Sequence, residues 1–270
     1  MHQNLRGERA AARDALRALA ESEPGIAAYQ FWYGTAIFET IGEMGVFAQI
    51  SWNGTGRAAL VEAVRLDPGN PTYRFGLAQY YINAPGIAGG SYAMADEQAR
   101  ALLALPEGRG KFLAHLTLAG IAASKEDWPE VSRQFAEAED SSGVGASREN
   151  ALRAHAQALL MRKKDPDAAI PIIERYLQTA APDNTTPHYF MGLARQQKKE
   201  YSAAIVSFQT VLSHAPESRY TRYALAQCYQ AIGNNAQALI HYEEFSARFP
   251  DDSKAAQAKA EAKKLRKTLK

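Results

Sequence analysis

Two consecutive stretches decide the fold: YFMGLARQQKKEYSAAIVSFQTVLSHAP at residues 189–216 and YALAQCYQAIGNNAQALIHYEEFSARFP at residues 223–250. Each ends in a proline, and Pro182, Pro216 and Pro250 recur at intervals of 34 residues. Small and large apolar residues also recur at matching places within the two stretches. Each stretch therefore predicts two amphipathic helices joined by a short turn, and the constant period predicts a repeated unit.

A helix pair of this size cannot bury its apolar face alone, so it must stack on copies of itself. Both stretches resemble the tetratricopeptide-repeat (TPR) consensus, from Tyr189 through Tyr201 to Pro216 and from Arg222 to Pro250. The resemblance implies an all-α fold, a right-handed α-solenoid of helix-turn-helix repeats.

Weaker matches extend the register over nearly the whole chain, which predicts one TPR superhelical domain over residues 1–270. Regular repeats are expected at 185–218 and 219–252, and divergent repeats over 25–182. One divergent repeat, at 147–182, shows a one-residue slip, and another, beginning near Ala27, has a turn about ten residues too long by comparison with the regular period. Residues 12–24 resemble a second helix without a first, and 253–270 form a polar capping helix. The total is about six helix pairs plus an N-terminal orphan helix and the cap.

The turn Asn83-Ala-Pro-Gly-Ile-Ala-Gly-Gly-Ser-Tyr92 is longer than the turns of the regular units. No Gly-Lys-Ser/Thr follows it and no strand precedes it, which excludes a phosphate-binding loop. We interpret it as an insertion whose glycines permit unusual backbone angles, with a partner contact as the alternative. Its Pro-Gly-x-x-Gly-Gly pattern resembles a turn of bacterial cell-envelope TPR proteins.

An apolar segment, Met44 to Trp52, lies in the over-long turn, with Phe31, Trp32 and Tyr33 upstream. Two interpretations are open. The segment either packs locally and closes one end of the stack, or forms an exposed patch through which the chain associates with itself.

Composition argues against several other classes of protein. The net charge is +2 for 270 residues, too balanced to indicate nucleic acid as a partner. No apolar run reaches the roughly 18 residues of a membrane span. The basic tail at 263–267 lacks interleaved aromatic residues, so we interpret it as solubilising, with contact to nucleic acid or lipid headgroups as the alternative.

The sequence also offers little catalytic or metal-binding chemistry. Cys228 is the single cysteine, and the six histidines form no His-x-x-x-His pair, so no metal site is expected. No Gly-x-Ser-x-Gly elbow is present. We therefore predict no catalytic residues, no cofactor and no enzymatic activity.

The TPR resemblance implies that the first helix of each pair lines a concave face, where most partners of such proteins bind. The positions expected to contact a protein or peptide partner combine aromatic rings and amides without charge: Phe75, Gln79, Tyr189, Leu193, Gln196, Tyr220, Tyr223 and Gln227. A carboxylate clamp is not expected, because its positions carry Phe190 and Ala224. For each tyrosine, the alternative is a space-filling role between neighbouring helices.

The predicted function is a non-catalytic scaffold that binds a polypeptide in its concave groove. The alternatives are a self-associating structural module and a protein that binds a small molecule or a glycan. The chain begins with an orphan second helix, which suggests that an upstream segment was removed. The expected location is the periplasm or cell envelope if that segment held an export signal, and the cytoplasm if Met1 is the native start.

Overall fold

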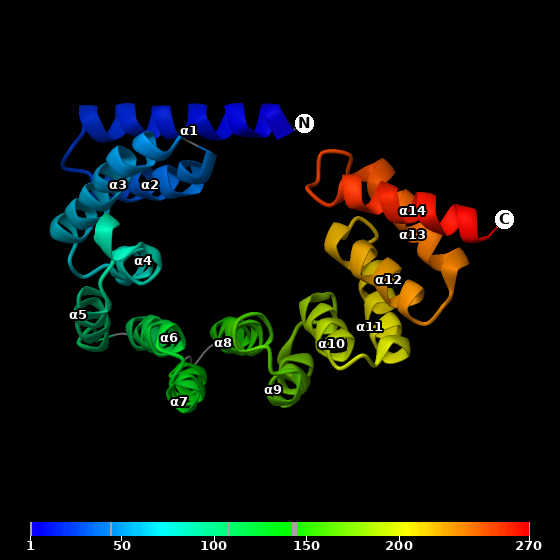
Figure 1. The fold of residues 1–270 in the computed structure, drawn as a ribbon. Helices are drawn as coiled ribbons and strands as arrows, with labels where there is room; N and C mark the ends of the chain where they lie inside the picture. The colour runs from blue at the N-terminus through cyan, green and yellow to red at the C-terminus, as the bar shows by residue number, and fades with distance from the viewer. Residues whose placement is uncertain (1, 44, 107, 142–144, 270) are drawn as a thin grey trace. The chain divides into compact units, whose positions relative to one another are not determined.

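The computed structural model describes residues 2–43, 45–106, 108–141 and 145–269, which form fourteen α-helices and no strand (Figure 1). The predicted all-α fold, with six helix pairs between an orphan helix and a cap, is confirmed. The chain divides into two compact units, unit 1 at Met1–Ser147 and unit 2 at Arg148–Lys270. That all 270 residues act as one domain stays a prediction.

Unit 1 consists of the orphan helix and three pairs, in which each helix packs on the next along the chain and the first helices α4 and α6 also touch. Its helices are α1 (His2–Ser22), α2 (Ala27–Thr40), α3 (Val46–Leu66), α4 (Pro71–Asn83), α5 (Tyr92–Leu103), α6 (Gly108–Ser124) and α7 (Trp128–Asp140).

Unit 2 contains three pairs and the cap, and its first helices α10 and α12 touch in the same way. Its helices are α8 (Gly145–Gln157), which begins just before the unit boundary, α9 (Pro166–Thr179), α10 (Thr186–Gln197), α11 (Tyr201–His214), α12 (Arg219–Ala231), α13 (Asn235–Arg248) and α14 (Ala255–Thr268).

The turns inside four of the helix pairs share one backbone feature. Each contains a residue with positive φ: Glu126, Lys164, Lys199 and Gly233, at 59°, 56°, 61° and 77°. The left-handed conformation reverses the chain directly after a helix and satisfies its last carbonyls. The short turns predicted inside the two regular repeats lie at Lys199 and Gly233.

Small residues allow the two helices of a pair to approach closely. In α10, Gly192 lies against the ring of Phe208 on α11, and Ala204 and Ala238 are fully buried at equivalent places. Phe208, Tyr242 and Phe245 are also almost completely buried and fill the space between successive helices. These contacts explain why the small and large positions recur with the repeat.

The prediction of an over-long turn after α2 is wrong. Helix α3 begins at Val46 and has 21 residues, so most of the extra residues lengthen the helix. Glycines at 45, 54 and 56 imitate a loop pattern, because glycine has a low helix propensity. Gly56 nevertheless suits α3, since a β-carbon there would lie 2.6 Å from the Phe38 ring of α2.

Trp52 is the described residue of the apolar segment 44–52 that packs against a core cluster; Ala48, Ile50 and Ser51 are exposed. Trp52 lies with Tyr33 and Ile37 in one cluster, and the Arg13 guanidinium sits 4.7 Å from the centre of its ring. Ile50 and Trp32 are exposed, at 69% and 53%. Met44 and the side chains of Val46 and Phe47 lie outside the described residues. Phe31, Tyr33 and Trp52 thus pack locally while Trp32 and Ile50 lie at the surface, and both interpretations of the segment stay predictions.

The one-residue slip in the 147–182 repeat has a structural cause. Helix α8 ends in a π-helical segment, Ala158–Lys163. A π-helical turn accommodates one extra residue without breaking the helix. Leu159 and Leu160 within it stay buried, so the segment keeps its place in the core.

The long turn between α4 and α5 is ordered by contacts with its own repeat. A short 3-10 helix, Gly86–Ala88, is followed by Gly89 at a φ of 93°. Tyr80 donates a hydrogen bond to the Ala88 carbonyl, and the Ser91 amide donates to the Tyr81 carbonyl at 2.9 Å. The insertion interpretation fits this geometry.

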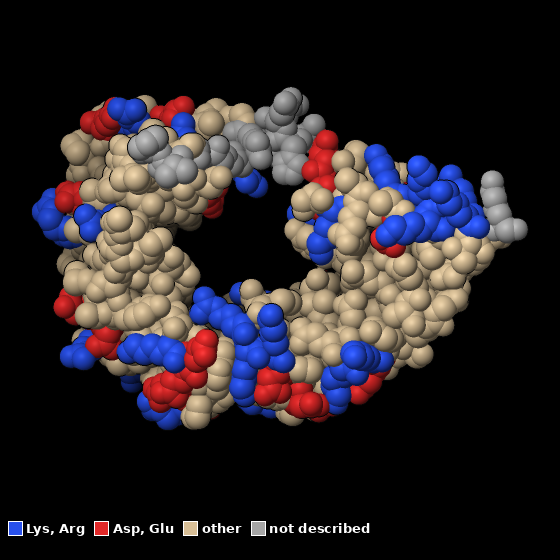
Figure 2. All heavy atoms as spheres, in the orientation of Figure 1, with Lys and Arg blue, Asp and Glu red and all other residues tan. Residues whose placement is uncertain are grey.

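Helix α14 covers the last pair as a cap. Its apolar stripe, Ala255, Ala258, Ala262 and Leu265, is buried against α13. The opposite side is basic, and Figure 2 shows Lys and Arg side chains gathered over this helix. A polar outer face is what the end of a repeat stack requires.

Candidate functional site

Two neighbouring first helices of unit 2 present the surface on which the sequence places most partner contacts. We call it the α10/α12 face and define it by Tyr189, Leu193 and Gln196 of α10 with Tyr220 and Gln227 of α12. The Gln196 amide donates to the Gln227 carbonyl oxygen at 3.4 Å, which joins the two helices at the surface. Their remaining donors and acceptors can bind a main chain.

The two tyrosines of this face differ in exposure. Tyr189 is partly buried between two core clusters, and burial raises the pKa of its phenol, with Tyr220 adding to the shift. Tyr220 is 51% exposed. Tyr189 therefore forms the floor of the α10/α12 face, and Tyr220 presents its ring and hydroxyl at the surface of that face.

Tyr223 lies apart from this face. Its side chain is only 3% exposed and packs on Tyr242 and Phe245, with ring centres 5.7 and 5.2 Å away. The Lys254 ammonium lies 4.7 Å from the centre of its ring. Of the two roles left open for Tyr223, this geometry favours space filling.

The α10/α12 face is not free of charge, contrary to expectation. The Arg219 guanidinium stacks over the Tyr220 ring at 4.6 Å and lies 3.6 Å from the Asp252 carboxylate. Arg219 is the first residue of α12, so the charge stands at one edge of the face. The sequence pattern missed it because Arg219 precedes the positions assigned to the face.

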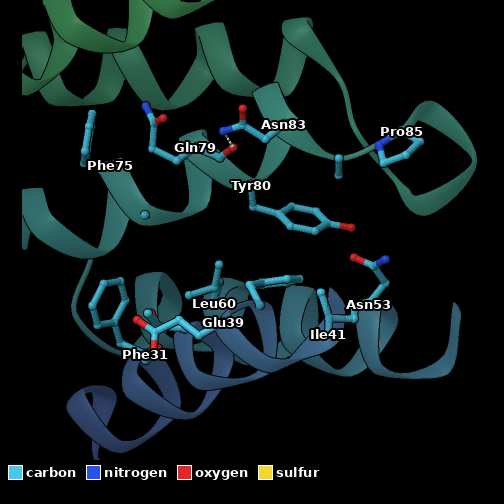
Figure 3. A pocket seen from close by; sticks show the side chains of 14 residues that line it. Phe31, Glu39, Ile41, Asn53, Leu60, Phe75, Gln79, Tyr80, Asn83 and Pro85 are labelled. Carbon is cyan, nitrogen blue, oxygen red and sulfur yellow. Dashed lines mark hydrogen bonds between the residues drawn. The ribbon is translucent and has the colours of Figure 1, made fainter. Parts of the chain in front are cut away.

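The other two predicted contact residues, Phe75 and Gln79, line a pocket of about 540 Å³ in unit 1. Its walls come from α2, α3, α4 and the turn after α4. Figure 3 shows Phe75, Gln79 and Asn83 along α4 on one side, with Glu39, Ile41 and Asn53 on the other. The volume is typical of ligand sites.

The floor of the pocket is apolar and tightly packed. Phe31, Leu60 and Tyr80 are all buried, and Phe38 and Tyr80 rings lie 5.0 Å apart. The Tyr80 hydroxyl is committed to the Ala88 carbonyl, and burial raises its pKa. The neutral phenol therefore contributes its ring to the pocket.

Polar groups stand around this floor. The lining includes the Glu39 carboxylate and the side-chain amides of Asn53, Gln79 and Asn83. The Asn83 amide donates to the Gln79 backbone carbonyl at 2.8 Å, which leaves its side-chain oxygen available. Phe31, Phe38, Glu39 and Tyr80 were not predicted as site residues, since their convergence depends on how α2 packs against α4.

The described ranges contain no candidate metal-binding cluster. No group of three or more His, Cys, Asp or Glu side chains in them could hold a metal ion. Cys228 is fully buried, which raises the pKa of its thiol to about 11. Among the same residues, no helix is long and apolar enough to cross a bilayer.

Comparisons with known proteins agree with this architecture. A family model described as Tetratricopeptide repeat matches residues 194–262. No curated protein sequence matches the chain.

Similar folds occur among solved structures. Yeast Tom70 aligns with a TM-score of 0.62 and 12% identity over 98% of this chain and 60% of its own. A chain of the APC/C Cut9-Hcn1 complex aligns with a TM-score of 0.54 and 16% identity, over 96% of this chain and 46% of its own. Pseudomonas aeruginosa pilF aligns with a TM-score of 0.53 and 15% identity, over 94% of this chain and 99% of its own. The chain thus spans about half of the Cut9-Hcn1 chain and less than two thirds of Tom70. At these identities the similarity concerns the fold.

Proposed function

We propose that this tetratricopeptide-repeat protein is a non-catalytic scaffold that holds an extended polypeptide along its first helices, which line the groove of a TPR stack. The TPR fold is generally a protein–protein interaction module. The observation that carries the proposal is the α10/α12 face. There, two side-chain amides meet across adjacent first helices, and one of these helices, α12, also carries an exposed tyrosine.

The chemistry of this face suits a main chain better than a folded surface. Glutamine side chains offer both donors and acceptors, as a peptide bond does. Tyrosine gives a large contact area and a polar tip at low conformational cost. Leu193 and the partly buried Tyr189 supply an apolar floor between them. An extended segment can therefore pair its backbone with the glutamines and place side chains on the rings.

Site-specific photo-crosslinking tests the proposal. A benzoylphenylalanine at position 227 is compared with one at position 206, since Val206 is a 60% exposed residue of the second helix α11. We expect position 227 to capture a defined protein in the cells of origin, and position 206 to capture it much less. Equal capture at both positions, or capture at 206 alone, would contradict binding by first helices.

A further inference from the structure

We infer that the pocket of unit 1 receives a large apolar side chain of a polypeptide whose neighbouring residue is basic, with Glu39 as the counter-charge. The choice of a polypeptide as occupant rests on the proposed function. The pocket and its charge stand on the geometry of unit 1 alone.

The apolar part of the pocket accounts for the preference for a large apolar side chain. Phe31, Leu60 and Tyr80 are exposed by only 6%, 2% and 6%, so they form a fixed floor. A volume of about 540 Å³ exceeds a single side chain. One aromatic or large aliphatic residue fits there together with part of its neighbour.

The charge of the pocket accounts for the preference for a basic neighbouring residue. Among the lining residues Glu39 is the only acid, and no Lys, Arg or His lines the pocket. Its carboxylate makes no ion pair within the described part of the chain. The side-chain amides of Asn53 and Gln79 also have no hydrogen-bond partner there, and each adds a carbonyl acceptor. A cation beside the apolar anchor is therefore favoured, and an anionic ligand is opposed by Glu39.

The walls are preorganised, which reduces the entropy lost on binding. A β-carbon at Gly76 would lie 2.5 Å from the Phe31 ring, so this ring packs directly on the backbone of α4. On the opposite side the turn is held by the Tyr80 to Ala88 hydrogen bond. The pocket thus exists before any ligand arrives.

The test uses two labelled peptides in a Gly-Ser background, read by fluorescence anisotropy at low salt with the full chain. One carries a tryptophan followed by two lysines, and the other a tryptophan followed by two glutamates. We expect the lysine peptide to bind at least fivefold more tightly. Glu39→Gln should remove this preference, and Glu39→Lys should reverse it. Both substitutions are at an exposed side chain, so the fold is retained.

A matched control is Glu23→Gln, an exposed carboxylate of unit 1 outside the pocket, which should leave both affinities within twofold. Phe75→Ala should weaken binding of the lysine peptide, since the substitution removes part of the pocket wall. An affinity unchanged by Glu39→Gln would overturn the inference while leaving the proposed scaffold function intact. Binding of tryptamine with the same dependence on Glu39, without binding of either peptide, would also overturn it, because the occupant would then be a small amine.

Discussion

Gly192→Ala tests whether close contact between α10 and α11 holds the regular repeat together. A β-carbon at this position would lie 2.4, 2.6 and 2.8 Å from three atoms of the Phe208 ring. Phe208 is fully buried, so its ring cannot move into solvent. The substitution therefore forces the two helices apart.

Two opposing terms give the magnitude. Replacing glycine by alanine inside a helix is worth about 1 kcal/mol in propensity. Overpacking a core costs about 1–3 kcal/mol, and three contacts this short place Gly192→Ala near the upper end. The expected net destabilisation is about 2 kcal/mol, which lowers the Tm by about 8 °C if unit 2 unfolds by itself and by about 4 °C if the whole chain unfolds together.

The measurement is thermal and urea unfolding followed by far-ultraviolet circular dichroism, with Gly54→Ala as the matched control. Gly54 lies in helix α3 with nothing within 4 Å of its built β-carbon, so alanine there should stabilise by about 0.5–1 kcal/mol. Phe208→Leu introduced into Gly192→Ala should recover at least about 0.5 kcal/mol as a coupling energy. If Gly192→Ala instead stabilises the chain as Gly54→Ala does, the assigned contact is wrong.

Three further predictions concern single sites. Gly90→Ala should destabilise unit 1 by about 2–3 kcal/mol in urea unfolding, because its methyl group would lie 1.8 Å from the Ala84 carbonyl oxygen, whereas Gly86→Ala should be neutral, with nothing within 4 Å. Burial lowers the pKa of His155 from 6.5 to about 4, so the unfolded chain binds this proton more tightly and stability falls as the pH drops from 6.5 towards 4. The loss should reach about 2 kcal/mol by pH 5, and urea titrations at pH 7 and pH 5 should show less pH dependence in His155→Leu; an identical dependence would refute the assignment. Cys228, with its thiol pKa raised to about 11 by burial, should react with a disulfide reagent only after unfolding, and rapid labelling of the native chain would contradict its burial.

The regular repeats could be predicted because each position has one dominant constraint. Gly192 and Ala204 must be small, Phe208 must be large, and the prolines stop the second helices. These demands recur in register, so two adjacent units reveal the period. The positions Gln196 and Gln227, predicted to contact a partner, followed from the same register, and the structure places their side chains in contact with each other.

The irregular parts could not be predicted because tertiary packing outweighs local propensity there. Helix α3 keeps Gly54 and Gly56, although glycine disfavours a helix, because Gly56 permits contact with Phe38. The π-helical segment keeps Leu159 and Leu160 buried. Which residues a helix buries depends on its neighbours, so the local sequence does not predict this segment. The role proposed for Glu39 likewise depends on α2 and α4 meeting around one pocket.

The central claim is that first helices bind a polypeptide, and the most direct test is the affinity of the segment captured at position 227. Titration calorimetry compares the unaltered chain, the double variant Tyr220→Ala/Gln227→Ala, and the control Val206→Ala on the second helix α11. We expect the double substitution to weaken binding at least tenfold, by about 1.4 kcal/mol or more, and the control to change it less than twofold. An affinity that survives the double substitution but falls with Val206→Ala would contradict the account.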